Sequence, residues 1–179
     1  MHCWKIINVD RDFGTARIIL LSVLTFIITF SLSYVLLNIN RVDAYTDRYL
    51  WINIIGLIIL YPVHKIFHYL LIIDYTKKIS IKIRIRFRFI PIVHLKIKHT
   101  IPKYRYLASL LAPFILFNSI LLVCAVQFPT YSHYISIYFG IHCAICLIDL
   151  LNVKGIINAP KHAIIEETPK GYEVLVPLE

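Results

Sequence analysis

The sequence predicts an integral membrane protein that is mainly α-helical, with four transmembrane helices, an amphipathic β segment on the cytoplasmic side and a small C-terminal β-hairpin. Of the 179 residues, 59% are hydrophobic and only 16% are charged, whereas soluble domains average about half apolar and a quarter charged. Four apolar runs are long enough to cross a bilayer, and a stretch of alternating basic residues separates the second from the third. We expect residues 1–179 to form a single integral membrane domain.

The first two spans are predicted at residues 17–37 and 50–73. A mixed polar leader precedes the first span, and residues 12–15 are typical of a turn. A short charged loop joins the two spans. Within the second span, Pro62 lacks a backbone N–H, so we expect the helix to kink one turn before His64.

Residues 77–98 have a different period. Odd positions from 79 to 97 are apolar, and most even positions are polar or basic, which indicates β structure. One unbroken strand of this length would run roughly 60 Å, so we expect a bend at residues 90–92, around Pro91, that gives two strands or one sharply kinked strand. A sheet lying on lipid with a solvated basic face and a sheet that handles a substrate remain alternatives.

The third and fourth spans are predicted at residues 106–127 and 135–151, and residues 152–179 form a cytoplasmic tail. Within the tail, residues 163–167 and 172–176 flank a Pro-Lys-Gly turn and predict a hairpin. Its acidic residues, Glu166, Glu167 and Glu173, are expected to pair across strands with the basic segment.

The net charge of +9 is unevenly distributed, because residues 75–148 contain no Asp or Glu. A basic block beside membrane spans is typical of a cytoplasmic loop near anionic lipid head groups. We therefore expect a multi-pass protein of the cell membrane with both termini in the cytoplasm, in contact with the bilayer. Beside membrane spans, this charge does not indicate a nucleic-acid partner. The four cysteines predict no disulfide framework.

The candidate site begins with His64 and His68, which are one helical turn apart in the second span. Both imidazoles would lie on one helix face, close enough to bind one metal ion. Asp149 in the fourth span is expected at a similar depth, two or three residues from the cytoplasmic end. Two imidazoles and a carboxylate are a plausible ligand set for zinc, and they leave a fourth position for water or substrate.

Other interpretations of these residues remain open. In one alternative, the two histidines only join helices, through hydrogen bonds to Asn118, to serines or to a carbonyl freed by Pro62. In another, Asp149 forms an ion pair with Lys154. His142 and Cys146 share a helix face with Asp149 and are weaker ligand candidates, since cysteine in an apolar helix is usually a small hydrophobe. A haem held by two histidines has no supporting attachment motif.

Several of these residues occur in motifs that resemble a known family: Tyr61-Pro62-x-His64-x-x-x-His68, Pro91-x-Val93-His94, Cys146-x-x-Asp149 and Ala159-Pro160-Lys161. Over most of its length the chain resembles the "putative zincin peptidase" family of small bacterial membrane proteins. Its core also resembles the site-2-type intramembrane zinc metalloproteases. The resemblance implies a zincin-like fold in which His64 and His68 are metal ligands and Asp149 is the third.

The sequence departs from active zincins at Lys65. The residue after the first histidine is normally Glu, the general base that activates metal-bound water. A charged lysine cannot take that role, so we expect a metal-binding but catalytically degenerate protein, a pseudoenzyme that binds or regulates a membrane protein or an extended peptide. The alternatives are an active intramembrane metallopeptidase that uses Asp74 or a water network as its base, and a metal-free structural or regulatory membrane protein.

Overall fold

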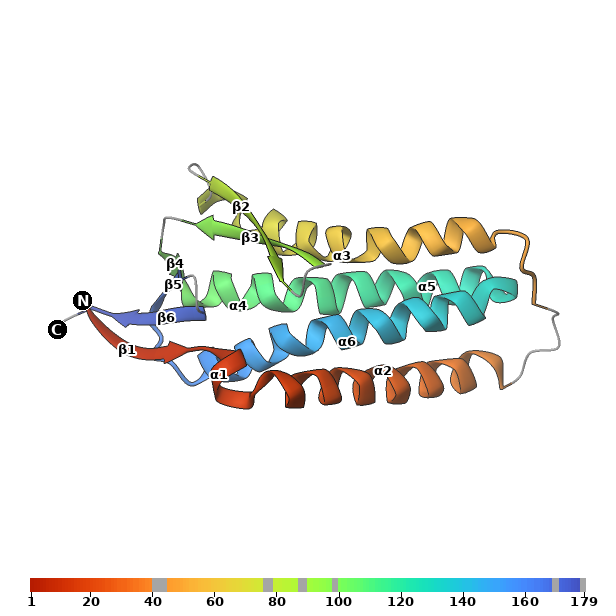
Figure 1. Cartoon of the computed structure of the whole chain (residues 1–179), viewed down its shortest axis with the longest axis horizontal. Helices are drawn as coiled ribbons and strands as arrows, with labels where there is room; N and C mark the ends of the chain where they lie inside the picture. The colour runs from red at the N-terminus through yellow and green to blue at the C-terminus, as the bar shows by residue number, and fades with distance from the viewer. Residues whose placement is uncertain (40–44, 76–78, 87–89, 98–99, 169–170, 178–179) are drawn as a thin grey trace.

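The computed structural model describes residues 1–39, 45–75, 79–86, 90–97, 100–168 and 171–177. Within these ranges, four long helical rods lie side by side in an elongated bundle (Figure 1). The strands and both chain ends gather at one end of the bundle. The short elements between the rods are α1 (Val9–Phe13) and the 3₁₀ turns η1 (Ile73–Tyr75) and η3 (Pro129–Tyr131).

The rods correspond to the four predicted spans. They are α2 (Thr15–Asn38), α3 (Leu50–Ile72), a third rod that runs from Lys103 to Gln127, and α6 (Ser132–Ile157). The third rod comprises α4 (Lys103–Ala112), a π-helical turn η2 (Pro113–Phe117) and α5 (Asn118–Gln127). Each of the four rods is long and apolar enough to cross a membrane. Large apolar side chains on the outside of α2 and α3, such as Ile28 and Ile58, are exposed, which suits contact with lipid. The mainly helical fold with long apolar helices is confirmed.

The fourth span is longer than predicted at both ends. We expected residues 135–151, followed by a tail at 152–179, but α6 continues to Ile157. Asn152 and Lys154 lower the hydropathy there, yet they do not interrupt the helical backbone, and Asn152 and Ile156 are buried. Asp149 therefore lies about two turns before the end of α6, deeper in the helix than the expected two or three residues.

A four-stranded antiparallel sheet has the order β1-β6-β5-β4. The C-terminal hairpin was predicted and consists of β5 (Ile164–Thr168) and β6 (Gly171–Val176). Its outer neighbours are β1 (His2–Ile7) and β4 (Ile101–Pro102). β1 lies in the polar leader, where the sequence predicted no element, because its partner β6 lies at the opposite end of the chain. A Cβ at position 171, where φ is +145°, would collide with a carbonyl of β1, so this turn requires glycine.

The basic segment forms a separate two-stranded antiparallel sheet, β2 (Ile79–Arg86) with β3 (Ile90–Ile97). The two predicted strands are present, but the expected bend at residues 90–92 is wrong, since Pro91 lies inside β3 opposite Ile85. Both strands of such a sheet have an outer edge, where proline is tolerated. The expected pairing of Glu166, Glu167 and Glu173 with the basic segment stays a prediction, because the side chains of that segment lie outside the described ones; the backbones of β3 and β5 do lie close together. Residues 77–78, 87–89 and 98 of the predicted segment lie outside the described ranges.

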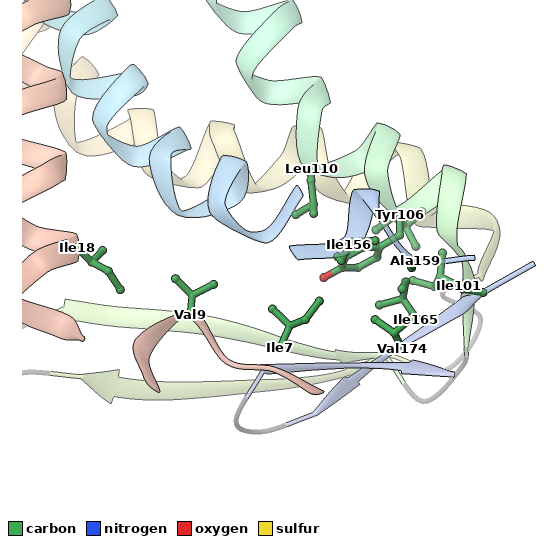
Figure 2. Close-up of a cluster of buried hydrophobic side chains, with 12 residues drawn as sticks. Ile7, Val9, Ile18, Ile101, Tyr106, Leu110, Ile156, Ala159, Ile165 and Val174 are labelled. Carbon is green, nitrogen blue, oxygen red and sulfur yellow. The ribbon is translucent and has the colours of Figure 1, made fainter. Parts of the chain in front are cut away.

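The main apolar core lies where the four-stranded sheet meets the ends of α4 and α6 (Figure 2). Lys103, a residue of the basic block, is buried at this junction. Its Nζ donates a hydrogen bond to the carbonyl of Ile157 at 2.8 Å and another to the carbonyl of Ala159, so the cation satisfies the C-terminal end of α6. The core comprises Ile7, Val9, Ile18, Ile72, Ile101, Tyr106, Leu110, Ile156, Ala159, Ala163, Ile165 and Val174.

Two glycines allow helices to pack closely around α6. A Cβ on Gly140 of α6 would press against Phe26 and Phe30 of α2. A Cβ on Gly56 of α3 would collide with the hydroxyl of Tyr138 on α6. That hydroxyl donates a hydrogen bond of 2.6 Å to the carbonyl of Asn53. These contacts hold α6 against α2 and α3, and the second brings the histidine helix close to the helix that carries Asp149.

Candidate metal centre

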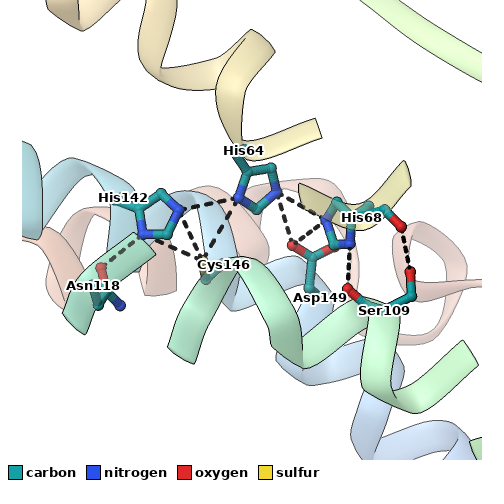
Figure 3. Close-up of polar contacts among 7 residues, drawn as sticks. All are labelled: His64, His68, Ser109, Asn118, His142, Cys146 and Asp149. Atoms are coloured by element: carbon teal, nitrogen blue, oxygen red, sulfur yellow. Dashed lines mark hydrogen bonds and ion pairs between the residues drawn. The ribbon is translucent and has the colours of Figure 1, made fainter. Parts of the chain in front are cut away.

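The polar cluster of the bundle lies between α3 and α6 (Figure 3). His64 and His68 come from α3, and Asp149 comes from α6, as the sequence predicted. The i, i+4 spacing of the histidines places both rings on the face of α3 that meets α6. His64 and Asp149 are buried, with 1% and 7% of their surface exposed. The helices therefore bring the three predicted residues together away from solvent.

Three ligand atoms of this cluster form a small triangle. His64 Nε2 lies 3.0 Å from His68 Nε2 and 3.1 Å from Asp149 Oδ2, and His68 Nε2 lies 3.3 Å from Asp149 Oδ2. Zinc bonds of about 2.0–2.1 Å place neighbouring donor atoms of a tetrahedral site about 3.3 Å apart. The triangle thus has the dimensions of one face of a tetrahedral metal site, and the fourth corner would be left for water or another ligand.

The hydrogen bonds of His68 determine which of its nitrogens carries the proton. Its Nδ1 lies 2.8 Å from the carbonyl oxygen of Ser109, which can only accept, so Nδ1 carries the hydrogen and Nε2 is bare in the neutral ring. The hydroxyl of Ser109 donates in return to the carbonyl of His68 at 3.1 Å. This reciprocal pair joins α3 to α4 and aims the bare Nε2 at Asp149.

The carbonyl of Ser109 is available because of Pro113. In a regular α-helix that carbonyl would accept the N–H of the residue four positions later, and proline has no N–H. The π-helical turn η2 begins at Pro113, and such turns recur at functional sites. We did not foresee the role of Ser109, although a proline four residues after it was the signal in the sequence.

A second chain of hydrogen bonds sets the proton of His64. Asn118 Oδ1 lies 2.7 Å from His142 Nδ1 and accepts its hydrogen, while the Asn118 amide group donates to Cys143 Sγ at 3.6 Å. His142 Nε2 is then bare and accepts from His64 Nδ1 at 3.2 Å. His64 Nε2 is consequently also bare. In one of the alternatives left open by the sequence, Asn118 bonds His64 or His68, but here it bonds His142.

The two chains leave three lone pairs pointing at one another: those of His64 Nε2, His68 Nε2 and Asp149 Oδ2. Among the described residues, Asp149 Oδ2 is buried without a hydrogen-bond donor. Such groups are costly unless a partner is supplied. A proton on one imidazole would relieve only part of the repulsion between the three lone pairs. A divalent cation at the centre would be bound by all three atoms. The donor set therefore fits a metal ion.

His142 and Cys146 lie closer to the site than the sequence suggested. Cys146 Sγ is 3.8 Å from His64 Nδ1 and 3.7 Å from His142 Nε2, and both residues are fully buried. His64, His142 and Cys146 thus form a second group of side chains with the spacing to hold a metal ion, and this group shares one imidazole with the first. The i, i+4, i+7 spacing of His142, Cys146 and Asp149 was the available signal.

The remaining predicted residues lie outside this cluster of contacts. Lys65 Nζ lies 5.7 Å from the ring centroid of Tyr61, one turn back along α3. Asp74 is exposed, and its Oδ2 lies 3.7 Å from Arg105 Nη1. Lys154 is exposed, and the ion-pair contacts that the structure gives Asp149 are those with His64 and His68.

Comparison with protein families agrees with this geometry. A family model described as "Putative zincin peptidase" matches residues 57–164, which is more than half of the chain. The matched region contains both α3 histidines, η2 and Asp149. Comparisons with curated proteins and with solved structures found no match. The chain therefore belongs to the "Putative zincin peptidase" family.

Proposed function

We propose that this protein is a membrane-embedded zinc-binding protein of the site-2-like zincin type, with His64, His68 and Asp149 as ligands and with little or no peptidase activity. The triangle of 3.0–3.3 Å between Nε2, Nε2 and Oδ2 carries the proposal, because three buried acceptors at this spacing require a cation. Zinc is favoured by two imidazoles and a carboxylate, although iron or cobalt would also be accepted.

The loss of activity rests on Lys65. Zinc in such a site would polarise a substrate carbonyl and lower the pKa of bound water, but an active zincin also needs the Glu that accepts the water proton. Lys65 occupies that position, and its ammonium group lies over the Tyr61 ring, one turn back along α3. Asp74, the alternative base, faces Arg105 instead. These positions favour a degenerate site over a working peptidase with another base.

The role that fits such a protein is binding or regulating another membrane protein or an extended peptide. β1 is the outer strand of the four-stranded sheet, and outer strands accept an added strand. By the positive-inside rule, both termini, the basic strands β2 and β3 and this sheet would lie in the cytoplasm, beside anionic lipid head groups of the cell membrane.

Metal content is the direct test. The protein is purified in detergent from zinc-supplemented cells, beside H64A and D149A, with E166Q as a control because Glu166 is an exposed carboxylate. Elemental analysis should find about one zinc per chain in the wild type and the control, and none in H64A or D149A. A wild-type protein without metal would overturn the proposal and favour a structural role in which the histidines only join helices.

The state of the catalytic machinery is tested separately with K65E. Cleavage of a fluorogenic protein substrate in detergent should be near background for the wild type and for K65Q, and should rise for K65E, because a carboxylate at position 65 supplies the missing base. A wild type that cleaves the substrate and loses activity in K65E would contradict the degenerate site and support a peptidase with another base.

A further inference from the structure

We infer that His142, oriented by Asn118, is a positioning residue that keeps the proton of His64 on Nδ1 and so leaves Nε2 free to bind metal. The inference rests on the proposed metal site. The geometry that supports it is a continuous line of short contacts from Asn118 Oδ1 through His142 to His64, drawn in Figure 3.

Asn118 determines the orientation of His142. Its Oδ1 accepts from His142 Nδ1 at 2.7 Å, and its amide group is engaged with Cys143. The ring of Phe117, at the end of η2, packs 4.6 Å from the His142 ring. His142 is therefore held by a hydrogen bond at Nδ1 and by an aromatic contact, and its bare Nε2 is directed at His64.

His142 decides between two tautomers of His64. Asp149 Oδ2, 3.1 Å from His64 Nε2, is a charged acceptor and would by itself draw the proton to Nε2, since hydrogen bonds to charged groups are the stronger ones. That tautomer would block the lone pair that binds metal. With the proton on Nε2, the bare His64 Nδ1 would face the bare His142 Nε2 at 3.2 Å in a buried site. That unmade hydrogen bond is costly, so the contact with His142 favours the proton on Nδ1 and leaves Nε2 free.

The two proposed ligands are thus supported in the same way. His68 has the carbonyl of Ser109 at its Nδ1, and His64 has His142. Metal-binding histidines commonly donate their second N–H to such an acceptor, which fixes the tautomer and raises the basicity of the ligand nitrogen. The acceptor of Ser109 is a backbone carbonyl, which substitution cannot remove, so His142 is the support that a single substitution can remove directly.

The alternative is that His64, His142 and Cys146 hold a second metal ion. The position of the thiol argues against this. Cys146 Sγ lies 3.7 Å from both nitrogens of His142, whereas a donor that shares a metal with Nε2 should lie nearer to Nε2 than to Nδ1. A second ion would also need His64 to lose its remaining proton, and the contact of His64 with His142 is then no longer a hydrogen bond.

Zinc affinity measured by chelator competition on the detergent-purified, metal-stripped protein tests the inference. H142L should bind zinc about 10–100-fold more weakly than the wild type, the usual cost of losing such a support. H142Q, whose amide oxygen can still accept from His64, should recover most of that loss. N118A should also bind weakly, because His142 could then move its proton to Nε2. C146A is the matched control and should bind like the wild type.

Tautomers read by NMR on ¹⁵N-histidine-labelled, metal-free protein give a result that does not depend on metal. In the wild type and H142Q the His64 proton should be on Nδ1, and in H142L it should move to Nε2. Wild-type affinity in H142L, or an unchanged tautomer, would overturn the inference. Two zinc ions in the wild type and one in C146A would also overturn it, in favour of the second site. A wild type that binds no zinc while its tautomers follow the prediction would contradict the proposed function alone.

Discussion

Asp149 is the residue whose environment is least compatible with a metal-free protein. Its Oδ2 is buried and faces two imidazole nitrogens at 3.1 and 3.3 Å, and the hydrogen bonds of those rings place their protons on the far side. A carboxylate is then surrounded by acceptors. Removing the charge of Asp149 should therefore raise the stability of the metal-free protein and lower its affinity for metal.

The first prediction concerns D149N. The new amide group can donate to a bare Nε2, so the metal-free variant should unfold at a higher temperature than the metal-free wild type, by about 1 kcal/mol of added stability. It should lose the further stabilisation that zinc gives the wild type. Thermal unfolding in detergent, with chelator and with zinc, measures both effects. A D149N protein that zinc still stabilises as strongly as the wild type would count against Asp149 as a ligand.

At the scale of single elements, η2 links backbone chemistry to the site. Pro113 begins this turn and leaves the carbonyl of Ser109 to His68. Asn118, which orients His142, follows directly after the turn. One irregular turn in the third rod therefore supports both histidines of α3, one through a carbonyl and the other through a side chain.

The second prediction follows from that link. P113A restores a backbone N–H that competes with His68 for the carbonyl of Ser109. Zinc affinity should fall by at least about tenfold, the lower end of the cost of losing a supporting hydrogen bond. P129A is the control, since Pro129 is at the first position of a short 3₁₀ turn, where an N–H has no helical partner. Equal affinities for P113A and the wild type would contradict this account of η2.

The third prediction concerns the packing of α3 against α6. G56A should destabilise the protein by about 1–3 kcal/mol because the new Cβ collides with the Tyr138 hydroxyl. Y138F removes that oxygen and its hydrogen bond to Asn53. The double variant should therefore lose less stability than the sum of the single losses. Chemical denaturation in mild detergent measures the four proteins of this cycle, and additive losses would show that the hydroxyl is not the obstacle.

The whole molecule combines an apolar bundle with sheets at one end only (Figure 1). Both termini lie at that end, and β2 and β3 run beside α3 and α4 in the half of the bundle nearest to it. A bilayer around the bundle would leave this end in water. From the distribution of Lys and Arg we propose that this end faces the cytoplasm.

The fourth prediction tests that orientation with Cys3, which is exposed on β1. In a C124A background, where the other two cysteines are buried, a membrane-impermeant maleimide should label Cys3 in inverted membrane vesicles and leave it unlabelled in intact cells. Labelling of intact cells would place the sheets outside the cytoplasm. Labelling after detergent treatment checks that the thiol is reactive.

Local patterns in the sequence predict a large part of this fold. Hydropathy locates the four apolar helices, since each needs only its own run of apolar residues, and alternation locates the strands of the basic segment. Turn residues locate the C-terminal hairpin. The i, i+4 spacing of His64 and His68 places two imidazoles on one helix face, and an acidic residue in an apolar helix marks Asp149 as a residue that needs a partner.

Tertiary structure decides which distant residues meet. The pairing of β1 with β6 joins the two ends of the chain, and no local pattern encodes that choice of partner. His142 meets His64 across 78 residues, because α3 and α6 approach closely where Gly56 faces Tyr138. The proton positions follow from those contacts. The sequence by itself therefore determined the helices and the candidate ligands, and packing decided that their lone pairs converge on one point.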